Sequence, residues 1–200
     1  MKQLSVLVAC ETSGKVREAF RKLGHHPSSC DLLPSDDNSL YHHQEDVFKV
    51  IREHDWDLII MHPPCTALCV SGNRWYGRNM AKNNERLTSL EWTLKLWELA
   101  KTRSNHVAME NPVSVLFSHI KEPVQYVQPW MFGHGETKKT GFALHNLPEL
   151  TPTNTVDGRL DRIHKMPPSK DRSKLRSETY QGIADAMAIQ WSKHCIDYIG

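Results

Sequence analysis

The stretch WDLIIMHPPCTALC, residues 56 to 69, joins an apolar run to two prolines and a cysteine. The run over 57–61 predicts a buried β-strand. Two consecutive prolines fix φ and remove two backbone donors, so the strand cannot continue through Pro63 and Pro64. The sequence therefore predicts that Cys65 stands on a stiff loop at the carboxyl end of a strand.

Strand and helix patterns alternate on both sides of this stretch. Strands are predicted over 3–9, 26–31, 57–61 and 106–110, and helices over 13–24, 84–103 and 180–199, with a short helix or turn over 44–54. Two further strands, around 124–128 and 140–145, are expected to form an antiparallel edge. This order predicts an α/β fold: a mostly parallel, Rossmann-like sheet with helices on both faces.

Composition is that of a globular protein. The 200 residues are 39% hydrophobic and 24% charged, which suits a single domain over 1–200. No apolar run is long enough to span a membrane, and the start does not resemble a signal peptide, so we expect a cytoplasmic location. The five cysteines are odd in number and scattered, which favours reduced thiols. A net charge of +2 does not discriminate between partners.

Polar or reactive residues follow four of the predicted strands. They are CETSG at 10–14, Asp31, HPPC at 62–65 and ENP at 110–112. Ligands of open α/β sheets bind beyond the carboxyl ends of the strands, so the four clusters predict one site. CETSG has a single glycine and matches neither the dinucleotide fingerprint nor the P-loop. A nucleoside cofactor without a pyrophosphate needs fewer glycines.

Each cluster also has a plainer interpretation. A cysteine such as Cys65 is intrinsically nucleophilic, yet free cysteines are often small buried hydrophobes. Zinc is disfavoured because Cys65 and Cys69 are spaced C-x-x-x-C and no H-x-E precedes them, so no metal is expected. Glu110 and Asn111 suit a helix cap before a proline, and Asp31 suits an exposed turn.

Two segments carry features of nucleic-acid binding. Residues 159–176 hold seven Lys or Arg against two Asp, which fits either a phosphate-binding stretch or a solvated loop. In GNRWYGRN, residues 72–79, the aromatic rings are candidates for stacking on a base, with burial of Trp75 under the loop as the alternative. The tryptophans of LEWTLKLWELA, residues 90–100, have the helical spacing of core residues.

The order VACETSGKVREAF, SCDLLP, HPPCTALCVSG, MENP and YQGIADAMA resembles the cytosine-C5 DNA methyltransferases, in the short, divergent form of phage and prophage genomes. The resemblance implies the class I methyltransferase sheet, the cofactor S-adenosyl-L-methionine and DNA, duplex or single-stranded, as the partner. It implies that Cys65 is the nucleophile that adds to C6 of cytosine and that Glu110 acts at N3. Asn111 would position the loop or the base, and the target base would be flipped out of a duplex.

The same resemblance implies a cofactor site and a nucleic-acid surface. The cofactor residues would be Glu11, Thr12, Ser13, Gly14, Asp31 at the ribose, Asp46 near the adenine, and Pro63. Lys138 and Thr140 replace two arginines of the family, and arginine does not exchange freely with either residue. Residues 145–179 form a short basic region in place of a recognition domain, which predicts relaxed or short sequence specificity. Arg172, Lys174 and Arg176 would contact phosphates.

Two other functions fit the sequence. One is a catalytically silent relative that binds nucleic acid. The other is a related enzyme that modifies a free pyrimidine nucleotide.

Overall fold

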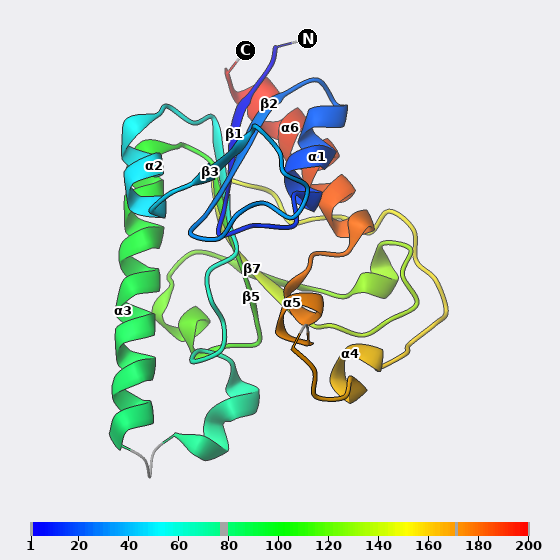
Figure 1. Ribbon diagram of the computed structural model, residues 1–200. Helices are drawn as coiled ribbons and strands as arrows, with labels where there is room; N and C mark the ends of the chain where they lie inside the picture. The colour runs from blue at the N-terminus through cyan, green and yellow to red at the C-terminus, as the bar shows by residue number, and fades with distance from the viewer. Residues whose placement is uncertain (1, 77–79, 171, 200) are drawn as a thin grey trace.

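The computed structural model describes residues 2–76, 80–170 and 172–199, and a seven-stranded sheet forms its centre (Figure 1). The strands are β1 (Ser5–Ala9), β2 (His26–Asp31), β3 (His42–Gln44), β4 (Leu58–Met61), β5 (Val107–Pro112), β6 (Val124–Val127) and β7 (Thr140–His145). Their order is β3-β2-β1-β4-β5-β7-β6. The pairs from β3 to β5 are parallel, and β7 runs antiparallel to β5 and β6. The predicted Rossmann-like fold with an antiparallel edge is confirmed.

Helices cover both faces of the sheet (Figure 1). On one face lie α1 (Lys15–Lys22) and α6 (Gln181–Ile199), and on the other lie α2 (Val47–Glu53) and α3 (Met80–Arg103). Alternate residues of β1 serve the two cores: Val6 and Val8 join the cluster that holds Trp191, and Leu7 joins the cluster that holds Trp97. Across the described ranges, no helix is both long and apolar enough to cross a membrane.

Some boundaries differ from the sequence prediction. Strand β3 was not predicted, and it occupies residues just before and within the predicted 44–54 element, whose helical part is α2 alone. Helix α3 begins at Met80, four residues before the predicted start at 84. The remaining short elements are η1 (Val70–Trp75), η2 (Val115–His119), η3 (Pro129–Met131), α4 (Arg162–Lys165) and α5 (Arg172–Ser177).

The segment 145–179 lies along the turn that follows η3. Isolated bridges join Phe132 to Asn154 and Glu136 to Leu160. Between these bridges two glycines allow close backbone approach, because a Cβ on Gly158 would lie 2.7 Å from the Cα of Gly135. The basic region is therefore held against the body of the fold.

Candidate active site

The ends of β4 and β5 bring Cys65 and Glu110 into one electrostatic site. Met61 pairs with Met109, so the residues that follow on each strand are neighbours at the same sheet edge. Beyond β4 the two prolines end the ladder, and the carbonyl of Cys65 accepts bonds from the amides of Leu68 (3.0 Å) and Cys69 (2.9 Å). Cys65 thus lies on a turn beyond β4, and Glu110 lies on the neighbouring strand β5.

The charges around Cys65 are coupled. Burial raises the pKa of the Cys65 thiol, and the carboxylate of Glu110 and the neighbouring Cys69 raise it further. The Lys138 ammonium acts in the opposite direction on this pKa. Burial in turn lowers the pKa of Lys138, and the negative charges of Glu110 and Cys65 oppose that shift. A carboxylate that disfavours the thiolate and an ammonium that favours it therefore both act on Cys65.

Asn111 fastens the proline loop to β5. Its side chain is fully buried, and its Nδ2 donates to the carbonyl of Pro63 at 3.3 Å. Its Oδ1 is buried and has no hydrogen-bond partner among the described residues. The helix-cap interpretation is wrong for Glu110 and Asn111, since both belong to β5 and Ser114 caps the helix η2.

His62 is a site residue that the sequence analysis did not single out. Its Nδ1 lies 3.5 Å from Oε2 of Glu110, and both side chains are largely buried, at 11% and 14% exposed. Its backbone amide donates to Ala9 on β1 at 2.9 Å. The only signal for it in the sequence is its position directly before the two prolines.

Arg86 on α3 is a second residue that sequence reasoning missed. Its Nε donates to the carbonyl of Ala67 at 2.8 Å, and Nη1 donates to Asn73 at 2.9 Å. The guanidinium also lies 3.6 Å from the ring centre of Tyr76. One side chain thus ties the loop after Cys65 to η1, a tertiary contact for which the sequence holds no local signal.

The loop 11–14 satisfies most of its polar groups within the protein. Glu11 is 6% exposed, and its Oε1 accepts bonds from the amide of Val16 (2.9 Å) and the hydroxyl of Ser13 (3.2 Å). This carboxylate therefore caps α1. Thr12 donates to Asp36 at 3.4 Å. Gly14 has a φ of 68° at the N-cap of α1, and a Cβ there would collide with the buried Arg17 guanidinium.

Asp31 and Asp46 are better candidates than loop 11–14 for hydrogen bonds to a nucleoside. Both carboxylates raise the pKa of Cys10, after the larger effect of burial, so both act on the space at the end of β1. Asp31 accepts the amide of Leu33 at 2.9 Å, and the exposed Asp46 caps α2 by accepting the amide of Lys49 at 3.2 Å. Carboxylates are the acceptors that ribose hydroxyls and an adenine amino group require.

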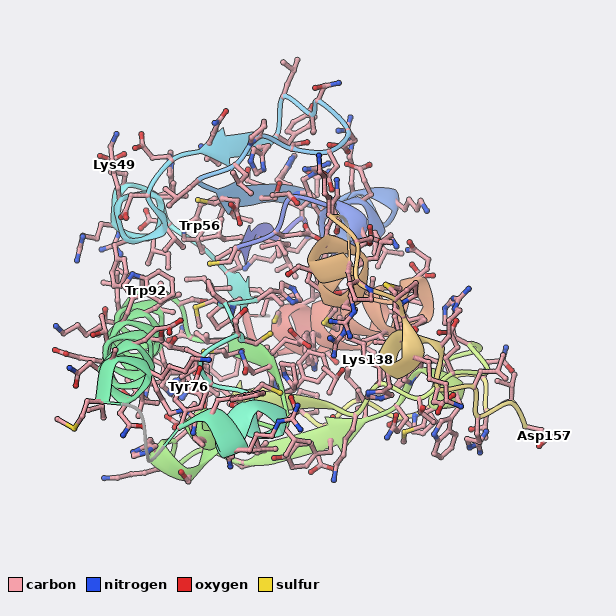
Figure 2. The ribbon with its side chains drawn as sticks, turned by 60° about the horizontal axis from the view of Figure 1, so that its bottom comes forward. Lys49, Trp56, Tyr76, Trp92, Lys138 and Asp157 are labelled. Atoms are coloured by element: carbon pink, nitrogen blue, oxygen red, sulfur yellow. The ribbon has the colours of Figure 1, made fainter. Side chains whose placement is uncertain are left out.

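Residues 174–178 contact three parts of the chain that are distant in sequence, at Asp36, Lys15 and Lys138. Lys174 pairs with Asp36 at 2.7 Å, and Glu178 pairs with Lys15 at 2.7 Å. The ammonium of Lys138 donates to the carbonyls of Ser177 (3.4 Å) and Glu178 (2.9 Å), and Figure 2 shows Lys138 beneath this part of the chain.

The other predicted phosphate-binding residues, Arg172 and Arg176, lie on α5. Arg172 donates to the carbonyl of Met166 at 2.8 Å, and the charge of Arg176 acts on Lys138. Thr140 is buried on β7 and donates to the carbonyl of Lys138 at 3.1 Å. Lys138 is thus the member of this set that stands beside Cys65 and Glu110.

The tryptophans divide between core and surface. Trp97 is 1% exposed, as its helical spacing predicts, whereas Trp75 is 55% exposed. The interpretation that Trp75 is buried under its loop is wrong. The last residues of the predicted stacking segment, 77–79, lie outside the described residues.

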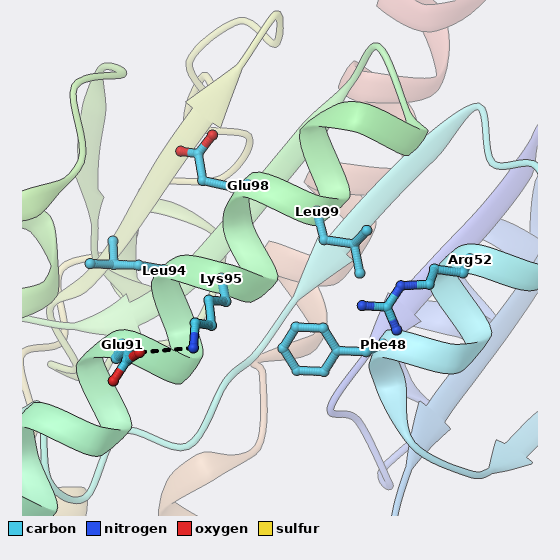
Figure 3. A pocket seen from close by; sticks show the side chains of 7 residues that line it. All are labelled: Phe48, Arg52, Glu91, Leu94, Lys95, Glu98 and Leu99. Atoms are coloured by element: carbon cyan, nitrogen blue, oxygen red, sulfur yellow. Dashed lines mark ion pairs between the residues drawn. The ribbon is translucent and has the colours of Figure 1, made fainter.

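An open hollow lies between α2 and α3, away from the strand ends (Figure 3). Phe48 and Arg52 of α2 face Leu99 of α3 across it, Leu94 also lines it, and Lys95 pairs with Glu91 at 2.8 Å on its rim. None of the predicted site residues lines it. Within the described ranges, no group of three His, Cys, Asp or Glu side chains is arranged to hold a metal ion.

Comparisons with known proteins show the fold. No family model and no curated protein matches the sequence. Among solved structures, the Entamoeba histolytica methyltransferase EhMeth superposes with a TM-score of 0.53 at 13% identity, covering 84% of this chain and 64% of that one. The S. pombe Dnmt2 methyltransferase gives 0.46 at 12% identity, covering 82% and 53%. The chain thus has the Rossmann-like methyltransferase fold and spans less than two thirds of either protein.

Proposed function

We propose that this protein is an S-adenosyl-L-methionine-dependent DNA cytosine-5 methyltransferase. The observation that supports the proposal is geometric: Met61 and Met109 are paired on neighbouring parallel strands, so the loop of Cys65 and the side chain of Glu110 lie at one sheet edge. Lys138 acts electrostatically on both groups. A thiol, a carboxyl group and a cation are the three groups that activation of a cytosine ring requires.

The reaction follows from the chemistry of cytosine. C5 is too weak a nucleophile until the ring becomes an enamine, which happens when the Cys65 thiolate bonds to C6 while Glu110 gives a proton to N3. The cofactor, when bound, supplies an electrophilic methyl group to C5. Loss of the C5 proton to a base then lets the Cys65 thiolate leave from C6, which restores the C5–C6 double bond while N3 returns its proton to Glu110.

The charges around Cys65 bear on its reactive form. The Glu110 carboxylate disfavours the Cys65 thiolate, and the Lys138 ammonium favours it. The reactive form has the proton on Glu110 and the negative charge on Cys65, where Lys138 stabilises it. Transfer of the Glu110 proton to N3 therefore accompanies attack by sulfur.

Cofactor binding rests on the acids at the strand ends. Asp31 would accept hydrogen bonds from the ribose hydroxyls, and Asp46 would accept one from the adenine amino group. The loop of Glu11, Thr12, Ser13 and Gly14 would contact the cofactor through its backbone. Pro63 is fixed by Asn111 and would form a wall of the same site.

The substrate is DNA with relaxed or short sequence specificity. The 35 residues of 145–179 are too few for a recognition domain of ordinary size. Arg172, Lys174 and Arg176 would contact phosphates from this segment by exchanging their present protein partners.

Transfer of tritium from labelled S-adenosyl-L-methionine tests the proposal. We expect label in acid-insoluble duplex or single-stranded DNA with the native protein and none with Cys65→Ser. Label found only in RNA or in free dCMP would show that the substrate is not DNA. Transfer that survives Cys65→Ser would show that another residue is the nucleophile.

A silent nucleic-acid-binding relative is the second candidate. It is favoured by the loop 11–14, whose polar groups are largely satisfied within the protein. Calorimetric titration with S-adenosylhomocysteine separates the two functions. Heat of binding that is reduced in Asp31→Ala supports the enzyme, and absence of heat supports the silent relative.

A further inference from the structure

We propose that Trp75 on η1 is a stacking platform for a base of single-stranded DNA, with Arg74 and Lys82 beside it to meet the phosphates. This inference rests on the proposed function for the identity of the polymer. It adds a binding surface outside the site built from the strand ends.

The exposure of Trp75 is unusual within this chain. Trp75 is 55% exposed, whereas Trp92 and Trp130 are half-buried and Trp56, Trp97 and Trp191 are 8%, 1% and 0% exposed. Tryptophan is enriched at interaction surfaces because its ring offers a large apolar face together with a polar N–H. Trp75 belongs to neither core cluster.

Two cations lie over the exposed ring. The guanidinium of Arg74 is 4.8 Å, and the ammonium of Lys82 is 5.4 Å, from its centre. At an exposed site a cation–π contact is weaker than the stacking of a base on an aromatic ring. A base can therefore displace a cation from the ring, and the displaced cation remains close enough to pair with the phosphate of the same strand.

The side chain of Arg86 connects the helix that carries Trp75 to the loop that carries Cys65. Arg86 donates to the carbonyl of Ala67, two residues after Cys65, and to the side chain of Asn73 within η1. The same guanidinium covers the ring of Tyr76, which Figure 2 shows beside α3. The loop that carries the nucleophile and the helix that carries Trp75 are thus held by one side chain.

The basic segment 159–176 offers a less available surface. Arg162 pairs with Glu136, Lys165 pairs with Asp161 at 3.0 Å, and Lys174 pairs with Asp36. Phosphates must compete with carboxylates for these cations. At η1 the guanidinium of Arg74 and the ammonium of Lys82 lie against an aromatic ring, which a base can also contact.

Fluorescence anisotropy of a labelled single-stranded oligonucleotide at fixed low salt tests the platform. Trp75→Ala is expected to weaken binding about tenfold, the loss of one stacked base, and Trp75→Phe to stay within about threefold of the native protein. The matched control is Tyr41→Ala, because Tyr41 is 49% exposed and lies under Arg21 at 4.2 Å. That control is expected to bind as the native protein does. Circular dichroism melts establish that each variant is folded.

Several outcomes would overturn the platform. They are unchanged affinity in Trp75→Ala, equal losses in Trp75→Ala and Tyr41→Ala, a loss with duplex DNA as large as with the single strand, or a loss confined to single-stranded RNA. The transfer assay separates this inference from the proposed function. Binding that depends on Trp75 without label transfer keeps the platform and removes the enzyme, and label transfer with Trp75-independent binding does the reverse.

Discussion

His62 and Glu110 face each other across the ends of β4 and β5, with 3.5 Å between Nδ1 and Oε2. The register explains the contact, because Met61 and Met109 are paired and each is followed directly by one of the two residues. Both side chains are largely buried, so neither rotates freely into solvent. The imidazole therefore limits the orientations of the carboxyl group that is proposed to act at N3.

Removal of that contact should slow the reaction more than it weakens binding. We expect His62→Ala to lower kcat for tritium transfer by roughly three- to tenfold, the worth of one polar contact that orients the carboxyl group, with little change in the KM for DNA. His62→Asn places an amide near the position of Nδ1 and should recover part of kcat. An equal fall of kcat in both variants would show that the ring acts only by packing.

The charges around Cys65 predict opposite effects on its reactivity. Glu110→Gln removes a negative charge that raises the pKa of the thiol, so alkylation of Cys65 by iodoacetamide near neutral pH should become faster although methyl transfer is lost. Lys138→Met removes the charge that opposes this rise, so alkylation should become slower.

Mass spectrometry of the peptide that contains Cys65 measures these rates. The thiols of Cys30 and Cys195 serve as internal controls, since burial raises the pKa of each to about 12 and neither adjoins Glu110. Equal rates in Glu110→Gln and the native protein would show that the two residues are not coupled.

Arg86 should control the order of the loop after Cys65. Arg86→Lys keeps a charge but loses the planar fork that reaches Ala67 and Asn73, so it should not substitute for arginine. We expect faster hydrogen exchange over residues 66–76 and a lower kcat, with a change in the free energy of unfolding of about 1 to 2 kcal/mol. Exchange at the native rate would leave Arg86 as a surface residue.

Stability should fall on acidification because His106 is buried. Its Nδ1 donates to the carbonyl of Asp57 at 3.2 Å, and Nε2 is buried without a hydrogen-bond partner among the described residues. Burial lowers the pKa of His106 in the folded state. The unfolded chain therefore binds the proton more readily, and the free energy of unfolding decreases as the pH falls through the unfolded value of about 6.5.

Urea titrations at about pH 7.5 and about pH 5.5 bracket that value. The difference in unfolding free energy should be smaller in His106→Leu than in the native protein. His26→Leu alters an exposed histidine and should leave the difference unchanged. A difference that is the same in all three proteins would exclude His106 as its source.

The sequence predicted the fold where apolar periodicity was strong. β1, β4 and β5 are short apolar runs bounded by polar residues, and α3 is a long run rich in the helix formers Leu, Glu and Lys, so each was found to within a few residues. β3 was missed because its residues, His42 to Gln44, are polar and lie at the sheet edge, where no alternation is required. Its pairing with β2 is a tertiary property.

The candidate site residues also fall into two groups, those that the strand order indicates and those that depend on tertiary contacts. Cys65 and Glu110 follow from the rule that strand ends share an edge, which needs only the order of the strands. His62 and Arg86 act through contacts across elements, and Glu11 turned inward to cap α1. Arg17 is a further example: on an amphipathic helix it is fully buried, where it pairs with Asp37 and donates to Ser29 at 2.7 Å.

The packing of α6 against α1 has a consequence for how the chain matures on the ribosome. β1 is translated long before α6, yet the face that holds Val6 and Val8 is covered by Ile183, Met187 and Trp191 of α6 together with residues of α1. Until α6 emerges, part of this apolar face stays exposed, so products truncated before α6 should be targets for chaperones and proteases.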